Sequence, residues 1–151
     1  MAPSRFCLLC LALTFASAQT AGPAVQRPFF GKWKLKPGDT KLHAGDDSKS
    51  LQWRIYEPDG DRVRVSWGNG DKRVGTYSAK CDGTPETITS GKIRCWQAGS
   101  NMIEGEQLDE SDKTHRYYRR SVSPNGKSMT ITWYSDANRK LETDRFVYTK
   151  D

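Results

Sequence analysis

After residue 30 the chain consists almost entirely of short stretches in which apolar and polar side chains alternate, separated by turn residues. An alternation with a period of two predicts half-buried β-strands. No stretch after residue 30 shows a convincing helical period, so an all-β domain is expected. The expected strands are 31–36, 50–57, 61–67, 72–81, 92–97, 101–109, 113–122, 127–134 and 140–149, with a weaker one at 86–90.

Turn residues between these strands indicate how the strands are joined. The segments 58–60 (Pro-Asp-Gly), 68–70 (Gly-Asn-Gly) and 124–126 (Pro-Asn-Gly) contain residue types that accept the backbone conformations of tight hairpins. Strands joined this tightly pair antiparallel with their neighbours. We therefore predict that residues 31–151 form an antiparallel up-and-down barrel of eight or nine strands, because closure removes the exposed sheet edges. A two-sheet β-sandwich is the alternative.

Residues 1–18 have the pattern of a secretory signal peptide. Arg5 precedes an almost wholly apolar stretch over residues 6–15, and the small residues at 16–18 precede a cleavage point. The apolar stretch is too short to span a bilayer, so no transmembrane segment is expected. The sequence predicts a secreted protein, extracellular or periplasmic, in which residues 19–30 form a flexible lead-in to the barrel.

The cysteine positions support an oxidising compartment. Cys7 and Cys10 fall within the predicted signal peptide, which leaves Cys81 and Cys95 as the one possible intramolecular pair. A disulfide that closes a loop of this size stabilises a fold by roughly 3 kcal/mol in the chain-entropy account. A metal pair or a reactive thiol is less favoured, because no histidine lies nearby in the sequence.

The first predicted strand opens with Gly31-Lys32-Trp33, which resembles the G-x-W motif of the lipocalins. That resemblance implies a calycin-type barrel in which Trp33 closes the base, covered by an arginine from late in the chain. Arg145 or Arg139 would supply that cation–π contact. The segment 31–37 is also similar to the opening of a group of secreted bacterial proteins with lipocalin-like features. The chain departs from typical lipocalins in lacking their C-terminal helix.

Large apolar side chains on the alternating faces are the candidate ligand-binding residues. Five tryptophans are many for a chain of this length, and apolar, aromatic walls are typical of small-molecule pockets. We expect the barrel interior to bind a small apolar or amphipathic molecule, the alternative being that these side chains fill a solid core. The candidate wall consists of Trp53, Trp67, Tyr77, Met102, Met129 and Trp133.

Two other classes of function remain open. The net charge is +6, and cations with aromatic rings gather at 115–120. An outer basic face of this kind would suit an anionic polysaccharide or membrane surface, whereas nucleic acid is not expected as a partner of a secreted protein. Glu104 and Glu106 share a face and would be the carboxylates of a lipocalin-like enzyme. We expect no catalytic residues, metal or cofactor, and a monomer.

Overall fold

The computed structural model describes residues 27–43, 51–89 and 91–151. The predicted signal peptide lies outside these residues, as does the lead-in up to residue 26. Two short 3-10 helices, η1 (Arg27–Phe29) and η2 (Pro37–Asp39), flank the first strand. The strands are β1 (Gly31–Leu35), β2 (Trp53–Asp59), β3 (Arg62–Asn69), β4 (Lys72–Ala79), β5 (Glu86–Ile88), β6 (Gly91–Gly99), β7 (Met102–Leu108), β8 (Thr114–Val122), β9 (Ser128–Tyr134) and β10 (Glu142–Lys150).

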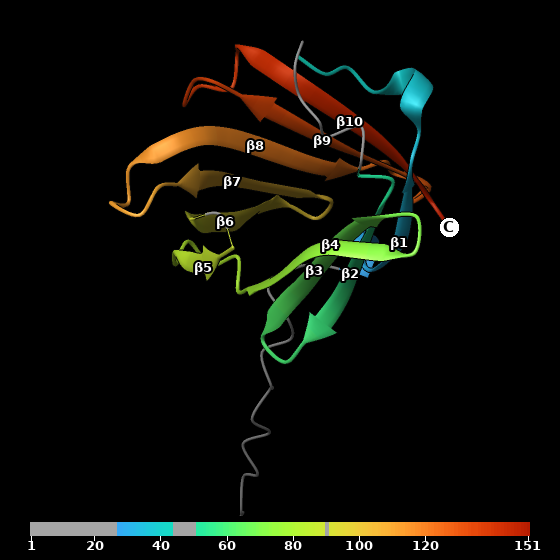
Figure 1. Ribbon diagram of the computed structural model, residues 1–151, viewed down its shortest axis with the longest axis horizontal. Helices are drawn as coiled ribbons and strands as arrows, with labels where there is room; N and C mark the ends of the chain where they lie inside the picture. Colours follow the sequence, from blue (N-terminus) through green and yellow to red (C-terminus); the bar gives the residue numbers. More distant parts are fainter. Residues whose placement is uncertain (1–26, 44–50, 90) are drawn as a thin grey trace, which may run out of the picture.

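The strands form a single antiparallel sheet that curls into a nearly closed barrel (Figure 1). Their order is β4-β3-β2-β1-β10-β9-β8-β7-β6-β5, so each strand pairs with its neighbour in sequence and β1 also pairs with β10. The predicted all-β class and up-and-down arrangement are confirmed. The sheet has ten strands because the weak segment at 86–90 forms the short strand β5.

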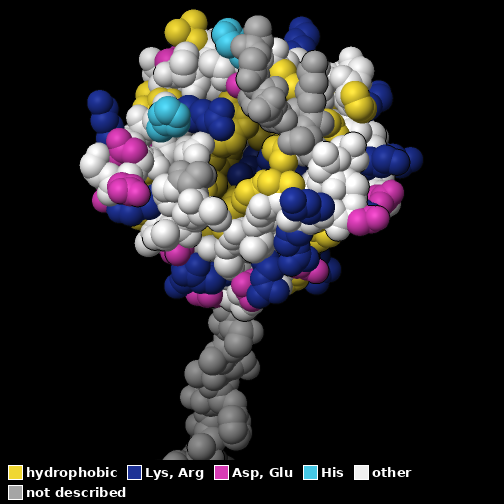
Figure 2. Space-filling view, viewed as in Figure 1, with side chains coloured by type: hydrophobic (Ala, Val, Ile, Leu, Met, Phe, Trp, Pro, Cys, Tyr) yellow, Lys and Arg dark blue, Asp and Glu magenta, His cyan; other side chains and the backbone are white. Residues whose placement is uncertain are grey.

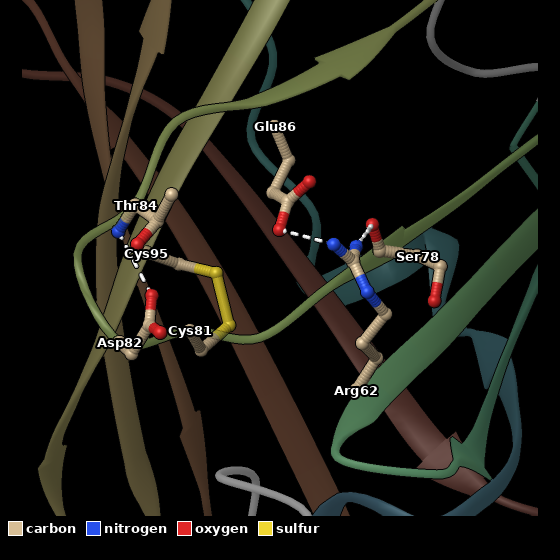
Figure 3. Close-up of a disulfide and its surroundings, with 7 residues drawn as sticks. All are labelled: Arg62, Ser78, Cys81, Asp82, Thr84, Glu86 and Cys95. Carbon is tan, nitrogen blue, oxygen red and sulfur yellow. Dashed lines mark hydrogen bonds and ion pairs between the residues drawn. A yellow bond between two sulfur atoms is a disulfide. The ribbon is translucent and has the colours of Figure 1, made fainter.

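In the described ring of strands, neighbouring strands are paired except at one seam, between β4 and β5, where no ladder of backbone pairs is formed. The Cys81–Cys95 disulfide crosses this seam, from the end of β4 to β6 (Figure 3). Beside it, Arg62 Nη2 of β3 donates to Glu86 Oε1 of β5 at 2.8 Å, and the amide of Gly83 donates to the Cys95 carbonyl at 2.8 Å. The predicted pairing of the two cysteines is thus observed, and it holds together the two edges of the sheet.

The base of the barrel is closed by η1 and Trp33. The Trp33 side chain is fully buried and donates from Nε1 to the carbonyl of Phe29 at 2.8 Å. Lys150, its neighbour on β10, covers the ring, with Nζ 5.1 Å from the centroid. The prediction that Arg145 or Arg139 provides this contact is wrong. Arg145 forms an ion pair with Glu142, and Arg139 packs over Trp96 and Tyr117.

Candidate ligand-binding interior

The half of the barrel nearest the base is solidly packed. Its interior side chains are almost completely inaccessible and come from strands on every side of the ring. They include Trp33, Val63, Ile103, Val122 and Met129. Met129, predicted as a wall residue of the cavity, therefore lies in the packed floor, where it is fully buried, and the alternative of a filled core applies to this half.

The opposite end of the barrel is open. Figure 2, which looks into this end, shows a central hollow walled mostly by hydrophobic side chains, with Lys or Arg side chains visible inside it. Trp67 and Trp133 are partly exposed residues packed against the buried core. Trp67 contacts Tyr77 at a centroid distance of 5.9 Å, and Trp133 meets Tyr118 edge-on at 5.1 Å. Three of the predicted wall residues, Trp67, Tyr77 and Trp133, are therefore interior residues.

Two glycines provide room for the aromatic rings of the neighbouring strands. A Cβ atom at Gly75 of β4 would lie 2.3 Å from the ring of Trp67, and one at Gly105 of β7 would lie 2.4 Å from the ring of Tyr118. Both rings therefore lie flat against a neighbouring strand instead of extending across the barrel. This arrangement helps to leave the hollow open.

Two wall predictions are wrong about which face the side chain occupies. On β2 the buried residues are Arg54 and Tyr56, so Trp53 lies on the outer face, where its Nε1 donates to the Gly70 carbonyl. On β7 the buried residues Ile103 and Gly105 face inward, and Met102 takes the other face. Pairing with the neighbouring strands explains both cases, because paired residues share a face of the sheet. Arg54 is directly paired with Trp33 and Trp67, and Ile103 is paired with the buried Arg120 of β8.

Two arginines lie inside the barrel, above the packed floor. Arg120 of β8 is 3% exposed and Arg54 of β2 is 8% exposed. Among the described residues, no carboxylate lies within ion-pair distance of either guanidinium. The sequence reasoning missed both residues, because it treated the polar positions of each strand as outward-facing.

Aromatic rings surround the two guanidinium groups. The Arg120 guanidinium carbon lies 4.5 Å from the ring centroid of Tyr118 and 5.8 Å from those of Tyr56 and Tyr77. Arg54 lies 5.7 Å from the Trp67 ring and 5.8 Å from that of Tyr148, and its Nε donates to the Tyr148 hydroxyl at 3.1 Å. These rings stabilise the cations in the absence of a carboxylate.

Several polar atoms around Arg120 have no hydrogen-bond partner within the described part of the chain. They are Arg120 Nε and the hydroxyls of Tyr56, Tyr77 and Tyr118. Burial raises the pKa of Tyr77 and that of Tyr118, although Arg120 opposes the shift. Both phenols therefore remain protonated at neutral pH, when each can donate a hydrogen bond. The interior thus holds buried donors that lack acceptors.

A pocket of about 530 Å³ lies at the open end, near the start of β2 and the end of β1. Leu35 and Leu42 line it and also pack against the core. The segment after β1 is held against the last strands there, because the amide of His43 donates to Asp144 Oδ1 at 2.8 Å. The other lining residues are Lys34, Pro37, Thr40 and Gln52.

The carboxylates considered for catalysis lie on the outer face, in ion pairs. Glu104 accepts from Arg119 at 2.6 Å and lies 3.7 Å from Arg139, which is packed over Trp96 and Tyr117. Glu106 pairs with Arg94 at 3.2 Å. On the other side of the barrel, the arginines Arg62 and Arg64 also pair with carboxylates, at 2.8 Å each. Much of the outer basic charge is therefore neutralised locally.

No protein-family model matches the chain, and no curated protein matches it. Within the described residues, no helix is long and apolar enough to cross a membrane. In the same part of the chain, no three His, Cys, Asp or Glu side chains gather as metal ligands would. The class of protein is therefore defined by its fold alone: a ten-stranded antiparallel up-and-down near-barrel, consistent with the lipocalin-like resemblance of its first strand.

Proposed function

We propose that this protein is a secreted, lipocalin-like carrier whose barrel holds one small amphipathic molecule. The observation that carries the proposal is the hollow at the open end, walled mostly by hydrophobic side chains above a solidly packed floor (Figure 2). Concave sites lined by apolar and aromatic side chains with a few polar groups are typical of small-molecule binding. A non-enzymatic role is proposed, since the carboxylates of Glu104 and Glu106 form ion pairs with arginines.

Secretion is part of the proposal. The Cys81–Cys95 disulfide joins the two edges of the sheet, and disulfides of this structural kind persist in oxidising compartments. The signal-peptide pattern of residues 1–18 supports the same location.

The aromatic residues of the wall provide an optical test. Decanol, a neutral amphipathic probe, is titrated into the disulfide-intact protein while tryptophan fluorescence is recorded, and native mass spectrometry counts the bound molecules. We expect a saturable change with one molecule bound. Trp67→Phe and Trp133→Phe should each diminish the change, because both rings belong to the interior.

Trp53→Phe is the matched control, since Trp53 lies on the outer face. It should leave the decanol-dependent part of the signal intact. A signal that never saturates, or one reduced equally by all three substitutions, would mean that decanol adsorbs to the surface and that the interior does not bind it.

A further inference from the structure

We propose that the barrel carries an internal anion site at Arg120 and Arg54, so that its ligand is an amphipathic acid bound with the carboxylate inward. This inference rests on the proposed function and deepens it by naming the chemical class of the ligand. It depends on three features of the interior: its uncompensated positive charge, its surplus of hydrogen-bond donors, and the position of Arg120 between the packed floor and the open end (the mouth) of the barrel.

The first feature is uncompensated positive charge. Arg54 and Arg120 are both more than nine-tenths buried, and neither has a carboxylate partner among the described residues. A guanidinium stays protonated in proteins, and burying it without an opposite charge is costly. Aromatic rings offset part of this cost. An anion entering the hollow would gain attraction from two cations at once, in surroundings that screen charge poorly.

The second feature is the kind of polar atom left without a partner. Arg120 Nε is a donor only, and the hydroxyls of Tyr56, Tyr77 and Tyr118 each have a proton to donate. A carboxylate is their chemical complement, because it offers about four acceptor positions and no donor. An alcohol would satisfy fewer of these groups, and an ammonium group would satisfy none of the N–H donors.

The third feature is the position of Arg120 along β8. Arg120 is paired with Ile103 and Ile131, one step above the layer of Val122 and Met129 that forms the floor. Toward the mouth the next inward pair is Tyr118 with Trp133. A carboxylate at Arg120 would therefore rest on the floor, and its apolar chain would run along the aromatic wall.

The length of the ligand follows from the same strand. Arg120 lies six positions along β8 from Thr114, which is at the open end of the barrel. At about 3.3 Å per residue this is roughly 20 Å along a tilted strand, so a medium-length chain would fit. Decanoate, which is ionised at pH 7, is therefore a suitable probe, with decanol and decylammonium as its neutral and cationic counterparts.

The three compounds are titrated into the disulfide-intact protein by calorimetry at constant ionic strength. We expect decanoate to bind at least tenfold more tightly than decanol, and decylammonium to bind more weakly than either. Arg120→Gln should abolish the preference for decanoate over decanol, while the affinity for decanol stays within about twofold of the wild-type value. Arg64→Gln, which removes an outer arginine paired with Asp59, should leave the preference unchanged.

A second variant covers the case in which Arg120→Gln does not fold. Tyr77→Phe retains the ring beside Arg120 and removes only one unpartnered hydroxyl, so it should reduce the preference for decanoate severalfold. If Arg120 were purely a structural cation packed among rings, wild-type protein would bind decanoate and decanol equally. That result would overturn the anion site and leave the proposed carrier function standing. If none of the three compounds bound, both proposals would fail for this class of ligand.

Discussion

Nζ of Lys150 lies 5.1 Å from the centroid of the Trp33 ring, and Trp33 in turn donates to the carbonyl of Phe29. The last strand thus covers the residue that closes the base, and the first helical turn accepts its hydrogen bond. Because Trp33 is fully buried, these contacts connect η1, β1 and β10 in one packed unit. The contributions of the two contacts can be separated by substitution.

We expect Trp33→Phe to lower the free energy of unfolding by about 1–3 kcal/mol, because it leaves the buried Phe29 carbonyl without its donor. Lys150→Met retains an apolar stem over the ring and loses only the charge, so its cost should be about 0.5–1 kcal/mol. Urea unfolding measures both values. Arg145→Met is the control and should change stability by about 0.5 kcal/mol or less, since Arg145 is a half-exposed residue paired with Glu142. A larger effect of Arg145→Met would contradict this account of the base.

Removing the disulfide should destabilise the barrel without changing the order of its strands. The Cys81→Ser, Cys95→Ser double variant loses the covalent link across the β4–β5 seam. We expect a loss of roughly 3 kcal/mol in the free energy of unfolding. Chemical denaturation with and without reductant provides the check: reductant should lower the stability of the wild type to that of the double variant and should not affect the variant. Equal stability of oxidised wild type and variant would refute the role given to this link.

Gly75 should not tolerate a side chain. A Cβ atom there would lie 2.3 Å from the Trp67 ring, so Gly75→Ala must displace that ring toward the hollow. We expect a loss of about 1–3 kcal/mol, as for overpacking, together with a change in tryptophan fluorescence. Gly38→Ala is a matched control, because no atom of the described residues lies within 4 Å of its Cβ position. Identical effects of the two substitutions would show that the loss is not due to the Trp67 contact.

Asp59 should make stability depend on pH in the acid range. A hydrogen bond from Ser78, aided by Arg64, lowers the pKa of Asp59 below its ordinary value, although burial opposes the shift. The folded state therefore binds this proton less readily than the unfolded state. The stabilisation is fully present above the ordinary aspartate pKa, near 3.9, and is lost as the pH falls through the lower folded value.

Urea unfolding of wild type and Asp59→Asn from pH 7 to pH 2.5 tests this. The wild type should be the more stable at neutral pH, and the difference should shrink below about pH 4. A difference that stays constant across this range would show that the charge of Asp59 contributes nothing.

The strand pattern could be predicted well because it depends on local chemistry. Turn residues such as Gly60, Gly70 and Gly126, all with positive φ, mark the hairpins, and the alternation between them marks the strands. Even β5 produced a weak signal at 86–90.

The face that each strand turns inward was harder to predict. Hydrophobicity favoured Trp53 over Arg54, yet Arg54 is the inward residue because it is paired with Trp33, whose place at the base is fixed. Trp33 was predicted to lie inside the barrel. Knowledge that Arg54 pairs with Trp33 would therefore have shown which face of β2 is inward, but the sequence of one strand does not reveal its pairing register. The same limitation put Met102 inside and left Arg120 unnoticed.

The base contact shows a different limit. An arginine late in the chain was expected over Trp33, and the position is occupied by Lys150. Only the register of β10 against β1 identifies that residue, through the pairing of Trp33 with Lys150. Local sequence patterns carry no information about this pairing.

The seam between β4 and β5 also affects how the barrel fluctuates. The other neighbouring strands of the described ring are joined by ladders of backbone pairs, some with a bulge, whereas this boundary depends on a disulfide, an ion pair and isolated backbone contacts. Amide protons on the facing edges of β4 and β5 lack the cooperative protection that a ladder gives. Hydrogen exchange should therefore be fastest along these two edges and slowest in β9 and β10, and local opening of the folded protein would begin at this boundary.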